Sequence, residues 1–165
     1  MTITGLKWSS FTCLTILTLV LIFGKGIVPV TSFIAFAQIT EGTKADDKLV
    51  GNSSGLSTDG IAGHASDDYI YGDYGNDVID GLNGSDHLSG GPGDDTIHGG
   101  DGADFIQGGE GNDKLFGEAG DDKLQGGPGA DLFDCGDGND VVEDFNATAG
   151  DTALSTCELI EEDND

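Results

Sequence analysis

Nine aspartates recur at intervals of nine residues, and each is followed two residues later by an apolar side chain. Carboxylates at a fixed spacing, with glycine loops between them that expose main-chain carbonyls, supply the hard oxygen ligands that Ca²⁺ prefers. Mg²⁺ fits less well, because it demands a small octahedral shell and retains its waters. The candidate metal ligands are Asp68, Asp77, Asp86, Asp95, Asp104, Asp113, Asp122, Asp131 and Asp140.

The elements that must position these aspartates form a repeat that runs from Gly63 to Glu143. If each copy is numbered from place one at Gly63, the aspartate occupies place six and the apolar residue occupies place eight. Place four is glycine in eight of the nine copies, Ser66 being the exception, which favours a tight loop. Places seven to nine are expected to form a very short strand whose middle side chain points inward. The apolar residues at place eight are Ile70, Ile79, Leu88, Ile97, Ile106, Leu115, Leu124, Phe133 and Val142.

Four copies resemble the RTX family of calcium-binding proteins, whose repeat reads GGxGxDxUx. They are GGPGDDTIH (90–98), GGDGADFIQ (99–107), GGEGNDKLF (108–116) and GGPGADLFD (126–134). The resemblance implies an all-β fold, a parallel β-roll or right-handed β-solenoid, in which two repeats make one coil and calcium ions lie between successive loops along each edge. Aspartates two repeats apart would then share an ion, as in Asp68 with Asp86, and up to about seven ions could bind.

Charge indicates what the roll can bind and how it folds. From Gln38 onward, four lysines oppose 31 acidic residues, a net charge of −27. Such a chain has no electrostatic means of holding nucleic acid, so its expected partners are cations.

Nine buried apolar side chains are too few to offset the ordering of the whole repeat region, so we expect calcium binding and folding to be coupled. A disordered spacer is the alternative, but it would not require an apolar residue at every place eight. Asp67, Asp94 and Asp121, at place five, are expected to be solvated loop residues.

Residues 1–37 have a different composition, with Lys7 before the apolar run Phe11 to Phe23 and small residues at Ala35 and Ala37. This pattern resembles a secretory signal. An uncleaved anchor is the alternative, although Lys25 would then lie within the bilayer. In an exported chain, Cys135 and Cys157 would form a disulfide, with two free thiols as the alternative.

The sequence therefore predicts a signal or anchor (1–37), a divergent entry cap (38–62), a calcium-binding roll (63–144) and an acidic exit cap (145–165). None of the common catalytic motifs occurs, so no enzymatic activity is expected. We expect a secreted or cell-surface calcium-binding module that acts through calcium-dependent folding and has a cell-surface or matrix component as its partner, with contact to a membrane only through an uncleaved N-terminal segment. One alternative is a structural or adhesive protein held by that segment. The other is an enzyme that binds polysaccharide through Tyr69, Tyr71, Tyr74, Phe105 and Phe116.

Overall fold

The computed structural model describes residues 39–45, 47–51, 58–157 and 159–162. The predicted signal or anchor in residues 1–37 lies outside this part of the chain. All regular elements in the described part are β-strands, and none of its segments forms a helix that could span a membrane.

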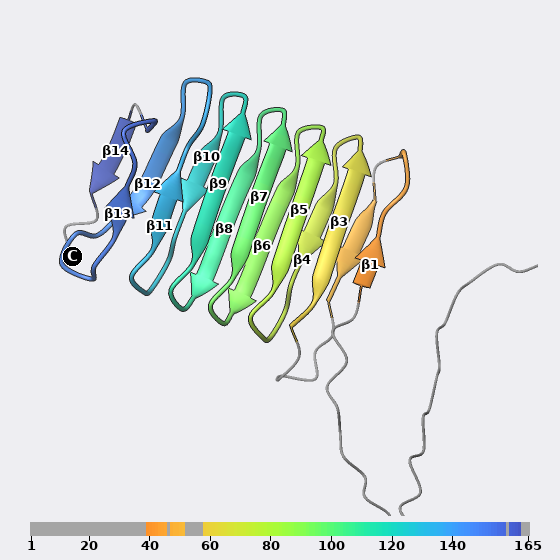
Figure 1. Ribbon diagram of the computed structural model, residues 1–165, viewed down its shortest axis with the longest axis horizontal. Helices are drawn as coiled ribbons and strands as arrows, with labels where there is room; N and C mark the ends of the chain where they lie inside the picture. The colour runs from red at the N-terminus through yellow and green to blue at the C-terminus, as the bar shows by residue number, and fades with distance from the viewer. Residues whose placement is uncertain (1–38, 46, 52–57, 158, 163–165) are drawn as a thin grey trace, which may run out of the picture. The chain divides into compact units, whose positions relative to one another are not determined.

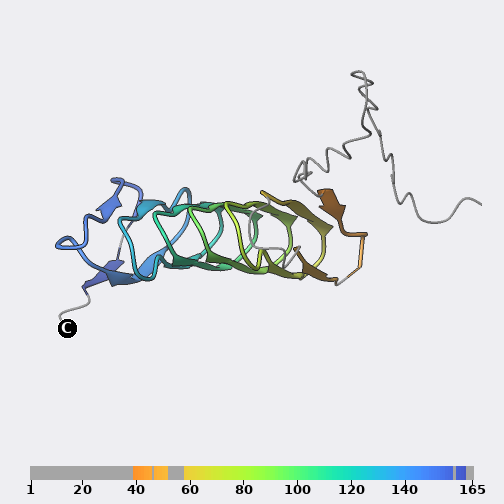
Figure 2. The ribbon, with the colours of Figure 1, turned by 90° about the horizontal axis from the view of Figure 1, so that it is seen from below.

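In the described residues, fourteen strands form two parallel sheets that face each other, and the chain alternates between them (Figures 1 and 2). Sheet A contains, in spatial order, β1 (Ile39–Glu41), β3 (Gly60–Ala65), β5 (Val78–Asn83), β7 (Thr96–Asp101), β9 (Lys114–Ala119), β11 (Leu132–Asp134) and β13 (Thr152–Ala153). Sheet B contains β2 (Lys48–Val50), β4 (Tyr69–Tyr71), β6 (His87–Pro92), β8 (Phe105–Glu110), β10 (Lys123–Gln125), β12 (Val141–Phe145) and β14 (Leu159–Glu162). This arrangement is a β-solenoid, as the repeat predicted.

Strand pairing advances by two repeats from one coil to the next. Ile79 pairs with Ile97 in sheet A, and Leu88 pairs with Ile106 in sheet B. Because the step is twice the sequence period, each repeat place stacks on the same place of the following coil. The expectation of two repeats per coil is therefore confirmed.

The core is a double row of apolar side chains between the sheets. All nine residues at place eight are fully buried, as predicted, and Ile61 and Cys135 complete the cluster. In the three residues at places seven to nine, the middle side chain points inward and its neighbours point outward, which is the alternation expected of β-structure. A core this narrow leaves much of the chain in loops and on the surface.

Six strands, β3 and β5 to β9, are twice as long as expected. β5, for example, continues from place seven through place three of the next repeat, because pairing resumes at Leu82 with Gly100 and at Asn83 with Asp101. Place two, where the second segment of these strands begins, adopts positive φ in all nine repeats. Five of these residues are glycine, but His64, Asp73, Leu82 and Glu118 adopt the same conformation. The loop geometry is thus imposed by the coil even where glycine is absent.

Both segments predicted as caps contribute strands to the sheets. At the N-terminal end, Ile39 pairs with Gly60 and Lys48 with Tyr69, a step slightly longer than two repeats. At the C-terminal end, Leu132 pairs with Thr152, which also exceeds two repeats. A disulfide joins Cys135 to Cys157, as predicted, and ties the C-terminal coil to the roll.

Candidate metal site

The predicted ligands form two rows, because each aspartate immediately precedes a strand. Asp77, Asp95, Asp113 and Asp131 precede the strands of sheet A, while Asp68, Asp86, Asp104, Asp122 and Asp140 precede those of sheet B. Each row follows one edge of the roll, where loops connect the two sheets (Figure 1). All nine side chains are at most 3% exposed. The structure therefore brings together the residues that the repeat spacing singled out.

Neighbouring aspartates within a row are joined by a hydrogen bond. The main-chain N–H of Asp77 donates to Oδ1 of Asp95 at 2.7 Å, and that of Asp95 donates to Oδ1 of Asp113 at 2.8 Å. The other row repeats this contact from Asp68 to Asp86 and onward at the same two-repeat step. One oxygen of each carboxylate thus fixes the position of the preceding coil.

The second carboxylate oxygen, Oδ2, is buried in the same loops. Within the described part of the chain it accepts no hydrogen bond in Asp68, Asp77, Asp86, Asp95, Asp104, Asp113, Asp122 or Asp131. A buried charged oxygen without a partner costs several kcal/mol unless a cation or a proton compensates it. This row of uncompensated oxygens indicates a ligand with positive charge.

Glycine at place one makes room for these oxygens. A Cβ added to Gly72 would lie 2.6 Å from Oδ2 of Asp77 and 2.6 Å from the carbonyl oxygen of Gly90 in the next coil. Gly72 does not have positive φ, so its role is space rather than backbone freedom. A carboxylate oxygen and a main-chain carbonyl from successive coils therefore converge on the same glycine.

Burial also changes the acidity of the carboxylates. Desolvation raises the pKa of Asp95 and of Asp104 to about 7, although a main-chain hydrogen bond to each opposes the shift and the neighbouring carboxylates add to it. The same causes raise the pKa of Asp113, Asp122 and Asp131 to about 6. The rows therefore favour either a bound proton or a bound cation near neutral pH.

The donor set fits calcium better than a transition metal. It contains carboxylate and carbonyl oxygens, which are hard ligands, and the flexible shell of Ca²⁺ accepts six to eight of them. No group of three or more His, Cys, Asp or Glu side chains converges within the described residues. Main-chain carbonyls and water would therefore have to supply most of each ion's ligands, with the aspartates supplying the charge.

Place five holds a second ladder, on the outside of the loops. Asp67, Asp94 and Asp121 are exposed, but they are not merely solvated as expected. Oδ1 of Asp94 accepts hydrogen bonds from the main-chain N–H of Asn112 at 2.9 Å and from its Nδ2 at 3.2 Å. Asp67 and Asp121 accept equivalent main-chain bonds one coil later. The polar side chains at place five therefore join successive coils by hydrogen bonds.

Sequence reasoning missed three members of the aspartate rows: Asp59, Asp151 and Asp47, whose main-chain N–H donates to Oδ1 of Asp68 at 2.7 Å. Asp59 is 1% exposed, and its main-chain N–H donates to Oδ1 of Asp77. It lies nine residues before Asp68, so the period itself could have assigned it to the repeat. Asp151 is 7% exposed and accepts from the N–H of Asp131 at 3.0 Å. It is eleven residues after Asp140, and this break in the period concealed it.

A comparison with known protein families finds a match over the repeats that form the aspartate rows. A family model described as the RTX calcium-binding nonapeptide repeat (4 copies) matches residues 55–88, 80–115 and 107–142, which together span more than half of the chain. No curated protein and no solved structure gives a significant match.

Proposed function

Since the chain belongs to the RTX calcium-binding nonapeptide repeat family, we propose that its nine repeat aspartates hold calcium ions between successive loops along both edges of the roll, and that these ions drive its folding. Calcium binding follows from the family, whereas the ligands, the number of ions and the coupling are our proposal. The observation that carries it is the row of buried Oδ2 atoms, since each needs a positive charge in the folded state.

Each pair of aspartates two repeats apart would share one ion. The pairs are Asp68 with Asp86, Asp77 with Asp95, Asp86 with Asp104, Asp95 with Asp113, Asp104 with Asp122, Asp113 with Asp131, and Asp122 with Asp140. Asp59 with Asp77 and Asp131 with Asp151 make the same contact in the structure and extend the rows. Seven divalent ions would change a net charge of −27 to about −13, which relieves the repulsion that opposes folding.

A calcium titration of the purified chain tests the coupling. Far-ultraviolet circular dichroism should show a cooperative gain of β signal with calcium and none at equal concentrations of magnesium, while a calcium indicator counts the ions bound. A spectrum that does not change with calcium would contradict coupled folding. Binding of only one or two ions would contradict the assignment to both rows.

We further propose that the protein is exported and acts as a calcium-stabilised module without catalytic activity. The secretory pattern of residues 1–37 supports export, and the disulfide is consistent with an oxidising compartment. The second candidate is an adhesive cell-surface protein anchored by an uncleaved N-terminal segment. Sequencing the N-terminus of the native protein separates them, since Gln38 as first residue means release and Met1 means anchoring.

A further inference from the structure

The outward face of sheet B differs from the rest of this acidic protein. At places seven and nine of β4, β6 and β8 the outward side chains are Tyr69, Tyr71, His87, Ser89, Phe105 and Gln107, and none of these is acidic, whereas Glu110 at the end of β8 is exposed. The chain as a whole has 31 acidic residues against six basic ones. The corresponding face of sheet A carries Asp80 on β5 and Asp134 on β11. A ligand over these positions of β4, β6 and β8 would therefore meet rings, an amide and a hydroxyl.

One column of this face is a closed stack of rings. Tyr69 stacks on His87 with 5.5 Å between ring centroids, and His87 stacks on Phe105 at 4.8 Å. The ammonium of Lys123 lies over the Phe105 ring, 5.4 Å from its centroid. His87 is covered by a ring on each side, whereas Tyr69, at the end of the stack, is 54% exposed.

Tyr71, in the adjacent column, is arranged differently. Its ring is tilted by 48° to that of His87, with 6.4 Å between centroids, and the residue is 36% exposed. Lys48, from the preceding coil, lies over the ring at 5.7 Å. Ser89 pairs with Tyr71 from the following coil. Ser89, a small side chain, is therefore the next residue of this column after Tyr71.

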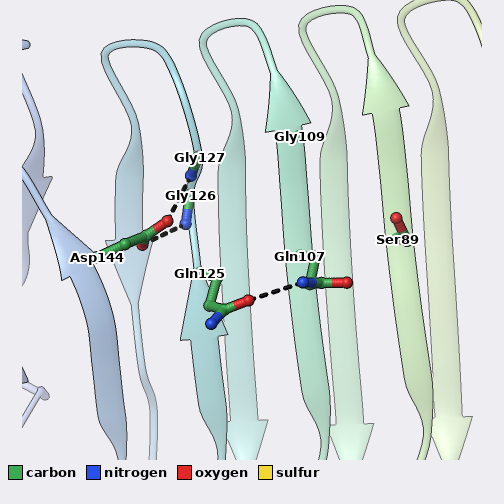
Figure 3. Close-up of a pocket in the computed structure, with 7 residues that line it drawn as sticks. All are labelled: Ser89, Gln107, Gly109, Gln125, Gly126, Gly127 and Asp144. Carbon is green, nitrogen blue, oxygen red and sulfur yellow. Dashed lines mark hydrogen bonds between the residues drawn. The ribbon is translucent and has the colours of Figure 1, made fainter.

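A hollow begins at Ser89 and continues along this column past Gln107 and Gln125 to Asp144, whose carboxylate accepts hydrogen bonds from the main-chain N–H groups of Gly126 and Gly127 (Figure 3). Nε2 of Gln107 donates to Oε1 of Gln125 at 2.7 Å, and Gln125 in turn donates to Glu143. These bonds fix the Gln107 amide with its oxygen toward Ser89, as Figure 3 shows. Among the described residues, neither this oxygen nor the Ser89 hydroxyl has a hydrogen-bond partner. An oriented acceptor and a hydroxyl thus lie next to a ring.

We propose that this hollow, which begins at Ser89 beside Tyr71, binds a neutral polysaccharide that runs along the axis of the roll. A pyranose ring presents a C–H face that packs on an aromatic ring and hydroxyls that bond to amide and hydroxyl groups, which is the combination found here. An anionic polymer would be repelled, because a chain of net charge −25 remains acidic, at about −11, with seven calcium ions bound. The outward positions recur in every coil, so an extended chain fits better than a single sugar. This binding goes beyond the proposed calcium function and requires only a folded roll.

Affinity electrophoresis of the full calcium-loaded chain tests the proposal, with gels that contain β-glucan, galactomannan or, as the anionic comparison, polygalacturonate. At least one neutral polymer should retard the protein, and Tyr71→Ala and Gln107→Leu should each weaken that binding about tenfold, or ~1.4 kcal/mol. Tyr71→Phe should retain it, because the ring remains. Phe116→Ala is the matched control, since Phe116 stacks on His98 on the outward face of sheet A.

Circular dichroism in calcium verifies that each variant is folded. Three results would overturn the proposal: no retardation by either neutral polymer, retardation by polygalacturonate alone, or an equal loss of binding in Phe116→Ala and Tyr71→Ala. The third result would mean that the aromatic surface is not specific to sheet B.

Discussion

The main-chain N–H of Asp86 donates a 2.7 Å hydrogen bond to Oδ1 of Asp104, which occupies the same place one coil later. The other oxygen of Asp104 is buried and has no hydrogen bond among the described residues. Each repeat aspartate therefore has two separable roles. Oδ1 fixes the register between coils, and Oδ2 places an uncompensated charge where a cation can bind. Substitution by asparagine retains the first role and removes the second.

The variant Asp95→Asn should weaken the response to calcium while leaving the coil intact. Its amide oxygen can still accept from the N–H of Asp77, but one ligand charge is lost. We expect the calcium concentration at the midpoint of folding to rise about tenfold or more, equivalent to at least ~1.4 kcal/mol. A calcium titration followed by far-ultraviolet circular dichroism measures this midpoint.

The neighbouring variant Asp94→Asn provides the control. Asp94 is exposed, and an asparagine there can still accept the hydrogen bonds from Asn112. Its midpoint should change by less than about twofold, because a screened surface charge contributes little. Equal shifts in the two variants would mean that overall charge, rather than place six, controls calcium binding.

Glycine at place one should be sensitive to the smallest side chain. In Gly99→Ala the new Cβ would lie 2.5 Å from Oδ2 of Asp104 and 2.7 Å from the carbonyl oxygen of Gly117. Both groups must move, so we expect a loss of about 1–3 kcal/mol in the free energy of unfolding at saturating calcium. Urea denaturation measures this loss.

Gly60→Ala is the matched control for that experiment. The nearest atom to its added Cβ is Cγ1 of Ile39, at 4.0 Å, so no group has to move. Its stability should therefore change by less than about 0.5 kcal/mol. A comparable loss at both positions would show that glycine serves the strand backbone and not the carboxylate.

Much of the fold could be predicted because the period fixes it. Aspartate at place six and an apolar residue at place eight, in every copy, require that equivalent residues stack, and Ile79 and Ile97 do pair in the structure. The same reasoning identified the aspartates that come together in rows. That calcium binds to those aspartates remains a prediction, because it concerns a ligand and not the chain.

The parts that escaped prediction are those where local sequence and coil geometry disagree. Leu82 and Glu118 give no indication of positive φ, yet the stacked coils impose it. Asp151 could not be found because the turn from Asn146 to Gly150 shifts the period by two residues. The hydrogen bonds at place five were not predicted, because within one repeat a side chain that bonds to the next coil has the same composition as any polar loop residue.

The imposed conformation at Leu82 leads to a stabilising substitution. Leu82 has φ of 75°, which a residue with a Cβ adopts at a cost of about 1–2 kcal/mol. We expect Leu82→Gly to leave the free energy of unfolding unchanged or to raise it by about 1 kcal/mol, measured by urea denaturation in calcium. Thr96→Gly, in a strand with ordinary φ, should instead lose about 1 kcal/mol. A loss in Leu82→Gly as large as that in Thr96→Gly would contradict the assignment of strain.

The disulfide should stabilise the C-terminal coil. Cys135 is fully buried, and the bond to Cys157 closes a loop with a sequence separation of 22 residues. Reduction should lower the free energy of unfolding at saturating calcium by about 3 kcal/mol on the chain-entropy model. Urea denaturation with and without reductant measures the difference, and the double variant Cys135→Ala/Cys157→Ala should be insensitive to reductant. No difference on reduction of the native chain would show that the C-terminal coil does not limit stability.

Acidity should affect the calcium-free and calcium-loaded chains in opposite directions. In the calcium-free roll, burial raises the pKa of Asp95 and Asp104 to about 7 and that of Asp113, Asp122 and Asp131 to about 6, from 3.8. The folded state then holds more protons than the unfolded state between pH 4 and 7. By linkage, the stability of the calcium-free roll falls as pH rises through this window. Calcium must displace the same protons, so its affinity falls as pH decreases.

In excess chelator, we therefore expect β signal to appear in circular dichroism as the pH is lowered from 8 to about 5. In calcium, the midpoint of folding should move to higher calcium concentration over the same range. Light scattering must be recorded in parallel, because the sequence pI of about 4.1 favours association at the acid end. A calcium-free chain that remains unfolded and monomeric at pH 5 would mean that proton binding cannot replace the ions. Coordination geometry, and not only neutralisation of the buried carboxylates, would then be required to close the coils.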